Sequence, residues 1–314
     1  QSQVQMAYLE ALVTANTESL TVSSDLRGWR GKQEPSVVPQ SLDDYRPTPA
    51  ANFGSRADTK WMEEDLLAEC EKDGGAVKIP MQWKPQDVEG DFSQAEAGSF
   101  SRRNVDVKGP TKPEQVLAKV AYPTKNVYFK AGQKHPYTGE TLKEDAVFNP
   151  DIDHAVKLAE DDPKGWAAKP MDDKWEILER AVEIFRRKRI ILDKSLMLNA
   201  GKSIPEAEGE VDEAMDGLNL SRLHSQILAG RDNLNLAPTG TGTATVICPK
   251  NFPNAIPILH IAPLLLAGHR VIVKPSGGED EETIWATYEA VKCLWEAGVP
   301  KEALIFLPCD NSQA

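Results

Sequence analysis

The stretch TATVICPKNFPNAIPILHIAPLLLAGHRVIVKPS, residues 243–276, carries the strongest fold signal in this sequence. It opens with the β-branched run Thr243–Cys248, which predicts a strand. The long apolar segment Ala255–Leu266 predicts a mostly buried helix, and Arg270–Val273 predicts a second strand. Strands separated by helices of this length predict a parallel sheet with right-handed crossovers.

The same alternation continues towards the end of the chain. Glu281–Ala297 predicts a second helix, and Leu304–Leu307 predicts a third strand. We therefore predict an α/β fold in which a doubly wound parallel sheet begins at Thr243. Such sheets bind ligands beyond the carboxyl ends of their strands. The polar loops Pro249–Asn251 and Lys274–Ser276 fall at that edge, so topology alone makes them a candidate site.

A hairpin and three helices are predicted between about residue 125 and this sheet. Val127 and Phe129, followed by the turn Tyr137–Glu140, predict a short β-hairpin. Asp173 and Glu176 stand three residues apart, which is typical of a capping box ahead of a long helix. The predicted helices cover Asp151–Glu160, the segment from Asp173 to a stop at Asn199–Lys202, and Pro205–Leu228.

Two charge runs in these helices are interpreted as solvated faces. The basic run Arg186–Arg189 has the spacing of charges on an exposed side of the long helix. In the last helix, acidic residues alternate with small ones, and a solvated face is favoured over a metal site. These acidic residues are Glu206, Glu208, Glu210, Asp212 and Glu213.

The first part of the chain lacks continuous periodicity and is rich in Pro, Gly, Ser and charged residues. Val4–Leu20 predicts one helix, and Thr59–Lys72 predicts another that ends at Gly74–Gly75. The rest is predicted to be loop-like. We predict an irregular helical linker or strap over residues 1–115, packed on another surface, and a domain over residues 116–314.

Composition excludes several classes of protein. The chain has 314 residues, of which 40% are hydrophobic and 27% charged, as in ordinary soluble globular proteins. Its net charge of −12 argues against general binding to nucleic acids or anionic membranes. No stretch is long and apolar enough to predict a membrane-spanning helix. Four cysteines without metal or disulfide spacing predict buried, reduced thiols in the bacterial cytoplasm or the mitochondrial matrix, namely Cys70, Cys248, Cys293 and Cys309.

Four segments, in order, resemble the aldehyde dehydrogenase superfamily. They are NAGKSIPEAEGEVDEAMDGLN at 199–219, CPKNFPNAIP at 248–257, LLLAGHRVIVKPS at 264–276 and LWEAGVPKEALIFLPCD at 294–310. The resemblance implies a cysteine thiolate that attacks an aldehyde, hydride transfer to a nicotinamide, and hydrolysis of the resulting thioester. It also implies a homo-oligomer, in which the hairpin around Tyr137 is a candidate contact.

The last segment and PNAIPILHIAPLLLAG are most similar to the 1-pyrroline-5-carboxylate dehydrogenase branch, which oxidises L-glutamate γ-semialdehyde to L-glutamate. In bifunctional enzymes of proline utilisation this branch follows a proline dehydrogenase domain. AYLEALVTANTESL, residues 7–20, resembles the end of such a domain. The resemblance implies that residues 1–115 include the tail of that domain.

The resemblance assigns roles to individual residues. Asn251 matches the side-chain amide that donates to the oxyanion; the alternative is an Asn that caps the following helix. Lys274 matches the lysine that binds the adenosine ribose; the alternative is a solvated surface charge. The implied cofactor is NAD, with NADP left open, and the predicted cofactor-binding residues are Ile247, Cys248, Pro249, Lys250, Lys274 and Ser276.

The sequence departs from the family pattern at four positions. Lys250 stands where an aromatic residue is usual, and Gly277 stands near the place of an acidic residue. Asn199 replaces a Glu, and His269 replaces an Asn. These departures bear on the affinity for the cofactor and on the choice between NAD and NADP.

None of the four cysteines matches the family's nucleophile, and the resemblance implies that the catalytic cysteine and the general-base glutamate lie beyond Asp310. The chain also begins with Gln1 rather than Met, so we expect translation to begin upstream. Two alternatives stay open: a non-catalytic assembly or regulatory protein that keeps this half-fold, and a dehydrogenase for another aldehyde or acyl-coenzyme A.

Overall fold

The carboxyl-terminal sheet has the topology that the sequence predicts. In the computed structural model, β6 (Thr243–Ile247), β7 (Arg270–Lys274) and β8 (Leu304–Phe306) are parallel and lie in the order β6–β7–β8. Helices α9 (Ala255–Leu266) and α10 (Ile284–Ala297) connect them. The predicted strand–helix–strand–helix–strand order is confirmed.

The structure describes residues 41–42, 45, 48, 60–72, 74–81, 103–110, 112–229, 242–277 and 283–313. The predicted helix Val4–Leu20 and the predicted start of α10 at Glu281 lie outside these residues. The chain divides into two compact units, one formed by residues 1–37 and 50–72 and the other by residues 38–49 and 73–314.

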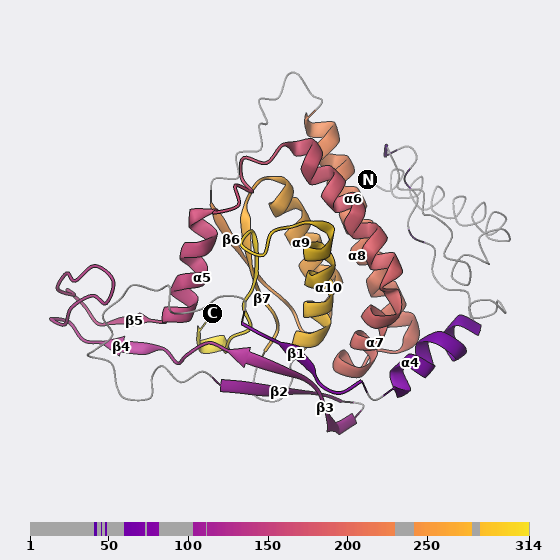
Figure 1. Cartoon of the computed structure of the whole chain (residues 1–314), viewed down its shortest axis with the longest axis horizontal. Coiled ribbons are helices and arrows are strands. Elements are labelled where there is room, and N and C mark those ends of the chain that lie inside the picture. The colour runs from indigo at the N-terminus through magenta and orange to yellow at the C-terminus, as the bar shows by residue number, and fades with distance from the viewer. Residues whose placement is uncertain are drawn as a thin grey trace, which may run out of the picture. The chain divides into compact units, whose positions relative to one another are not determined.

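Helices cover both faces of the β6–β7–β8 sheet, and β7 is buried at every position for this reason. On one face, α5 (Pro150–Asp161) packs its buried alanines, Ala155 and Ala159, against Ile272. On the other face, α9 and α10 pack against residues that include Val271 (Figure 1). The alternation of Val271 and Ile272 sends successive side chains to opposite faces, as in any pleated strand.

A helical layer packs outside α9 and α10. It consists of α6 (Met171–Arg187), α7 (Arg189–Ala200) and α8 (Ile204–Ala229). The single long helix of the prediction is two helices, because the backbone leaves the helical conformation at Lys188. The predicted stop is confirmed at Gly201, which ends α7 with a left-handed φ of 72°.

The predicted capping box at Asp173 and Glu176 is wrong. The residue before the first turn of α6 is Pro170, and Asp173 lies inside that turn. The helix therefore begins two residues earlier than predicted, and the two acidic side chains pair along it instead. Asp173 pairs with Lys169, and Glu176 with Arg180.

The prediction of solvated charge runs is wrong for four of the nine residues concerned, namely Arg189, Glu208, Glu210 and Asp212. Arg189 is only 5% exposed and donates hydrogen bonds to Glu208 and Asp212 of α8. Glu210 is also buried, with an exposed fraction of 1%. α8 contacts α6 and α7 as well as α9, so more than one side of it faces protein. Charges in such buried positions need oppositely charged or hydrogen-bonding partners from neighbouring elements.

The prediction of loop from Gly75 to Pro113 is wrong for three strands. β1 (Val77–Ile79), β2 (Arg103–Gly109) and β3 (Lys112–Tyr122) form a sheet in the order β1–β3–β2. β1 is parallel to β3, and β2 is antiparallel to it. β3 also crosses residue 115, where the strap was predicted to end.

The predicted hairpin and the helix after it are confirmed. β4 (Val127–Phe129) pairs antiparallel with β5 (Ala146–Phe148), and a single bridge joins Lys134 to Thr141 around the turn. α5 follows at once, and the side chain of Asn149 caps it by accepting from the backbone N–H of Ile152.

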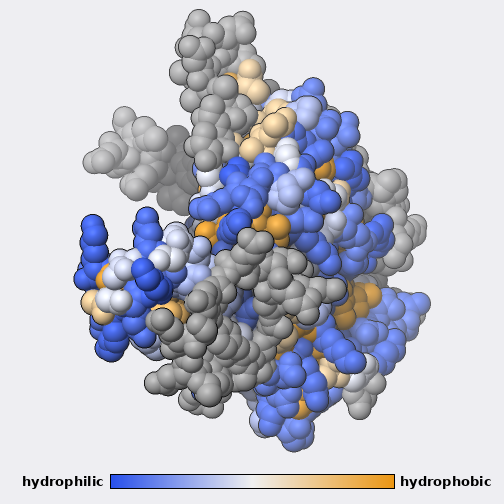
Figure 2. Space-filling view, turned by 60° about the vertical axis from the view of Figure 1, so that its left-hand side comes forward, coloured by the Kyte–Doolittle hydropathy of each residue, from blue (hydrophilic) through white to orange (hydrophobic). Residues whose placement is uncertain are grey.

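In the other unit, the described residues form a π-helix, η1 (Trp61–Leu67), which continues as α4 (Ala68–Glu71). The helix that the sequence predicts there is confirmed in its described part, although not in its π geometry. No described helix combines the length and the apolar character that crossing a membrane requires. On the face shown in Figure 2, most of the described surface is hydrophilic.

Candidate functional site

The two loops that the sequence singles out follow neighbouring strands. β6 and β7 pair up to Ile247 and Lys274, and the backbone N–H of Cys248 continues the ladder by donating to the carbonyl of Lys274 at 2.9 Å. The loop Pro249–Asn254 leaves the sheet directly after this bond. Both polar segments therefore begin at the carboxyl edge of the same sheet, where open α/β sheets bind their ligands.

Asn251 lies at the exposed tip of the loop Pro249–Asn254. The alternative in which Asn251 caps the following helix is wrong, because the residue before α9 is Asn254. Asn254 itself makes no side-chain cap bond. The Asn251 amide is therefore not used by the helix, and its role as a donor to a bound ligand stays a prediction.

A carboxylate from another helix caps α9 instead. Oε1 of Glu210 accepts from the backbone N–H groups of Asn254 at 2.7 Å and of Ala255 at 3.0 Å. Nζ of Lys202 lies 2.9 Å from the other carboxylate oxygen, Oε2. Burial raises the pKa of Glu210, while Lys202 and the two N–H groups oppose that shift.

Lys202 also contacts the loop directly. Its ammonium lies 4.1 Å from the ring centroid of Phe252, within the range of a cation–π interaction. The hydroxyl of Thr287 in α10 donates to the carbonyl of Pro253 at 2.7 Å. Three side chains outside the loop, those of Glu210, Lys202 and Thr287, thus hold its carboxyl half.

Sequence reasoning did not identify Glu210 and Lys202 as site residues. A signal was present, since Glu210 precedes Ala214 by four residues and Gly217 by seven, which places it on one helical face with two small residues. That face packs closely on α9: a Cβ on Gly217 would lie 2.4 Å from Cδ2 of Leu259. A face that approaches another helix so closely is not solvated.

The second loop begins at a buried lysine. Lys274 is 4% exposed, and its Nζ donates to Oδ1 of Asn311 at 2.6 Å. The alternative of a solvated surface charge is therefore wrong. Ile247, the register partner of Lys274, is 66% exposed although it is apolar. Ser276 is half-buried, and Gly277 is buried, so close to Tyr122 that a Cβ would lie 2.9 Å from its hydroxyl oxygen.

The remaining predicted site residues surround this pair. Pro249 is half-buried, Lys250 is exposed, and Cys248 is 6% exposed. The structure thus brings an apolar exposed side chain, a buried ammonium and an exposed amide to one edge of the sheet. No group of three or more His, Cys, Asp or Glu side chains suited to a metal ion occurs among the described residues.

All four thiols are buried, as predicted. Burial raises the pKa of Cys248 and of Cys293 to about 12, and that of Cys309 to about 11. Lys274 lowers the pKa of Cys248 and Cys309, but desolvation outweighs it. A nucleophilic cysteine needs the opposite shift, so these three thiols do not have the surroundings of a reactive thiolate.

A comparison with known protein families gives one result that covers more than half of the chain. The sequence model described as "Aldehyde dehydrogenase family" matches residues 130–314. The matched residues include the predicted site loops and the helices α6 to α10.

Curated relatives with different substrates are similar to this chain. The D-glyceraldehyde dehydrogenase (NADP(+)) of Picrophilus torridus is 32% identical over 188 residues, which are 57% of this chain and 37% of the relative. The 1-pyrroline-5-carboxylate dehydrogenase of Oceanobacillus iheyensis is 33% identical over 172 residues, 52% of this chain and 32% of the relative. The chain therefore spans about a third of the length of these relatives.

Solved structures share the fold. A proline utilization A protein from Bdellovibrio bacteriovorus superposes with a TM-score of 0.64 at 22% identity, over 89% of this chain and 26% of the other. A 1-pyrroline-5-carboxylate dehydrogenase from Thermus with bound NAD gives a TM-score of 0.62 at 20% identity, over 88% of this chain and 47% of the other.

Proposed function

The chain belongs to the aldehyde dehydrogenase family, and we propose that it is part of an NAD-dependent enzyme that oxidises L-glutamate γ-semialdehyde to L-glutamate. The substrate rests on the similarity to 1-pyrroline-5-carboxylate dehydrogenases, together with the matching residues 294–310. The activity of the whole protein is part of the proposal, because the chain covers about a third of its curated relatives.

One observation carries the proposed reaction: the buried Lys274 ends β7, and the exposed Asn251 lies in the loop that follows the adjacent parallel strand β6. Attack on an aldehyde places negative charge on the carbonyl oxygen, and a preorganised amide donor stabilises that charge. The amide of Asn251 keeps two N–H donors at any pH and is not used by the helix behind it. It is therefore suited to hold the oxygen while a thiol reacts.

The residues at the end of β7 fit a nicotinamide cofactor. Exposed Ile247 offers an apolar wall, and the ammonium of Lys274 next to it can donate to ribose hydroxyls. Lys274 donates to Asn311, and an ammonium has three donors. When bound, the cofactor supplies the hydride acceptor; the residues of this chain bind and orient it.

NADP is the second candidate cofactor. Gly277 places no carboxylate beside the predicted ribose position, so nothing at this residue repels a 2′-phosphate. Relatives named as NADP-dependent are among those similar to the chain. Titration of the intact protein with NAD and with NADP distinguishes the two.

Asn251→Ala in the intact enzyme tests the proposed role of the loop. We expect kcat/KM for the aldehyde to fall about 100- to 1,000-fold, as for the loss of one oxyanion donor. NAD affinity should change little. Asn104→Ala, at an exposed position on β2, is the matched control and should retain full activity. Full activity of Asn251→Ala would contradict the proposal.

The substrate is tested by comparing kcat/KM for three aldehydes with the same enzyme. We expect glutamate γ-semialdehyde to exceed D-glyceraldehyde and succinate semialdehyde. D-glyceraldehyde is the second candidate, because a D-glyceraldehyde dehydrogenase is 32% identical over 188 residues. A higher value for D-glyceraldehyde would reassign the substrate and leave the reaction class unchanged. If the intact protein binds nucleotide but oxidises no aldehyde, it is instead a non-catalytic member of the family.

A further inference from the structure

The loop that carries Asn251 is held by two charged residues that precede it in the sequence. Lys202 lies between α7 and α8, and Glu210 lies in α8. Gly201 ends α7 in a left-handed conformation, and Ser203 and Glu206 then start α8. The Glu206 carboxylate accepts from both the backbone N–H and the hydroxyl of Ser203, and the first of these bonds is one half of a capping box. This short connection fixes Lys202 between the two helices.

Glu210 lies two turns further along α8 and is 1% exposed. Its carboxylate meets the first turn of α9, where orphan N–H groups and the helix dipole favour a negative charge. Glu210 and Asn254 are separated by 44 residues in the sequence, so this bond ties two distant segments together. A buried carboxylate with these partners cannot move without leaving donors unpaired.

Lys202 is the second charged member of the network and links Glu210 to the loop. It pairs with Glu210 at 2.9 Å and lies over the ring of Phe252, the residue directly after Asn251. The loop is therefore fixed at its start by the sheet ladder at Cys248 and at its end by Glu210. Asn251 and Lys250 are the exposed residues between these two attachment points.

We propose that Glu210, together with Lys202, is a positioning residue that sets the conformation of the loop 249–254 and thereby aims the Asn251 amide at the reacting oxygen. The inference rests on the proposed function of Asn251. Neither side chain touches the substrate in this scheme; both act through the backbone of Asn254 and the ring of Phe252. A displacement of about 1 Å in such a donor can cost about 100-fold in rate.

The first experiment measures the loop itself. Hydrogen exchange of the backbone in residues 249–256 is compared between the intact wild-type enzyme and Glu210→Ala. We expect faster exchange confined to this segment. The matched control is Glu208→Ala, a buried carboxylate on the same helix that pairs with Arg189 of α7. It should leave exchange in 249–256 unchanged, and equal exchange in Glu210→Ala and the wild type would overturn the inference.

The second experiment measures coupling to Asn251. Glu210→Ala should lower kcat by about 10- to 100-fold. In an Asn251→Ala background the same change should cost less than about twofold, because the amide that it misplaces is already gone. Any loss of kcat caused by Glu208→Ala should instead be the same fold-change in the wild-type and the Asn251→Ala background, so that the two losses multiply. Losses that multiply for Glu210→Ala would make the residue merely structural and overturn the inference.

Glu210→Gln covers the case in which the alanine variant does not fold. It keeps an acceptor oxygen for the two N–H groups and removes the charge that faces Lys202. We expect a smaller loss of kcat with the same dependence on Asn251; independence from Asn251 would overturn the inference. Full activity of Asn251→Ala alone would instead overturn the proposed role of Asn251, and with it the inference that Glu210 acts on catalysis through that amide. The exchange experiment tests separately whether Glu210 sets the conformation of the loop 249–254.

Discussion

Nζ of Lys274 lies 2.6 Å from Oδ1 of Asn311, and this bond joins the end of β7 to the short 3-10 helix η3 (Asn311–Gln313) that follows β8. The bond holds an ammonium that is 4% exposed at the predicted cofactor edge. Its position is therefore set before any ligand binds, since β7 is buried along its whole length. Preorganised groups of this kind lose little entropy on binding.

Lys274→Met should weaken the binding of NAD to the intact enzyme by about 10- to 100-fold, because a hydrogen bond from a charged group contributes about 1.5–3 kcal/mol. Titration of nucleotide by fluorescence or calorimetry measures the affinity. Lys157→Met, an exposed position on α5, is the control and should bind normally. Unchanged affinity in Lys274→Met would remove Lys274 from the predicted cofactor site.

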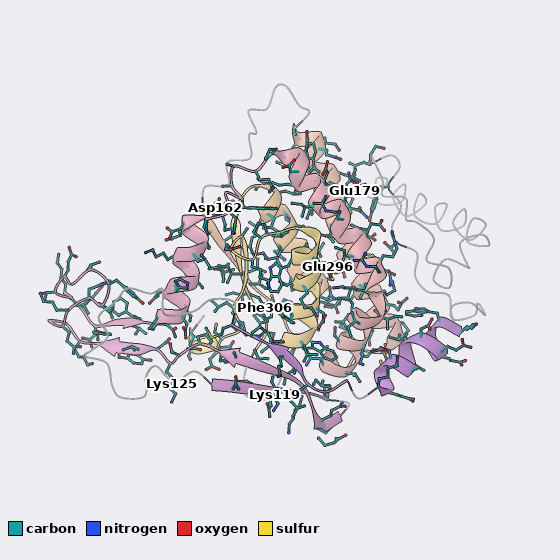
Figure 3. All side chains as sticks on the ribbon, in the orientation of Figure 1. Lys119, Lys125, Asp162, Glu179, Glu296 and Phe306 are labelled. Carbon is teal, nitrogen blue, oxygen red and sulfur yellow. The ribbon has the colours of Figure 1, made fainter. Side chains whose placement is uncertain are left out.

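Arg189→Met and Arg187→Met should differ strongly in stability although the two arginines are two residues apart. Arg189→Met leaves Glu208 and Asp212 without their buried partner and should cost about 3–5 kcal/mol in the free energy of unfolding. Arg187 is 61% exposed and pairs with Glu296 of α10, labelled in Figure 3. Its loss should cost at most about 1 kcal/mol. Chemical denaturation measures both free energies of unfolding. Equal costs would contradict the conclusion that Arg189 is a buried ion-pair partner and Arg187 an exposed one.

Gly109→Ala and Gly209→Ala should change the free energy of unfolding in opposite directions: the first should lower it and the second should raise it. A Cβ on Gly109 would lie 1.7 Å from the backbone oxygen of Leu198, so the end of β2 and α7 would have to separate. We expect a cost of about 3 kcal/mol or more. A Cβ on Gly209 meets nothing within 4 Å inside helix α8, and alanine there should add about 0.5–1 kcal/mol. Thermal and chemical denaturation test both variants.

The buried thiols should make stability fall at high pH. The pKa values of Cys248 and Cys293 are raised by burial from 9.0 to about 12, so the folded state retains protons that the unfolded state releases. Stability that is full below pH 9 is lost as the pH rises towards the folded values. Denaturation at pH 8 and pH 10 should show this loss, and a Cys248→Ala/Cys293→Ala variant should reduce it.

The same thiols should react slowly with a disulfide reagent at pH 8 in the folded protein, because little thiolate is present and access is poor. Unfolding in denaturant should restore the reaction. Rapid labelling of Cys248 in the folded state would contradict the burial of this thiol. The comparison uses Cys309 as an internal reference, since its pKa is also raised, to about 11.

The elements from Thr243 to Phe306 were predictable because each is signalled by its own residues. A β-branched run, a long apolar helix and short connecting turns suffice to predict strand, helix and strand. Phe306, labelled in Figure 3, illustrates the result: its ring lies 5.3 Å from that of Tyr288, where α10 returns over the sheet. The strands β1 to β3 were not predictable, since Val77 pairs with Ala118, a partner far along the chain.

Some features of the candidate site were likewise predictable from the sequence, and others were not. The sequence predicted that Asn251 and Lys274 lie at one edge of the sheet, because the carboxyl ends of parallel strands meet there. Which charges are buried follows from contacts between distant segments: Glu210 at the start of α9, Arg189 between two carboxylates, and Lys274 beside Asn311. The physical reason is that the free energy of a charge depends on the surface opposite it, and that surface comes from residues distant in the sequence.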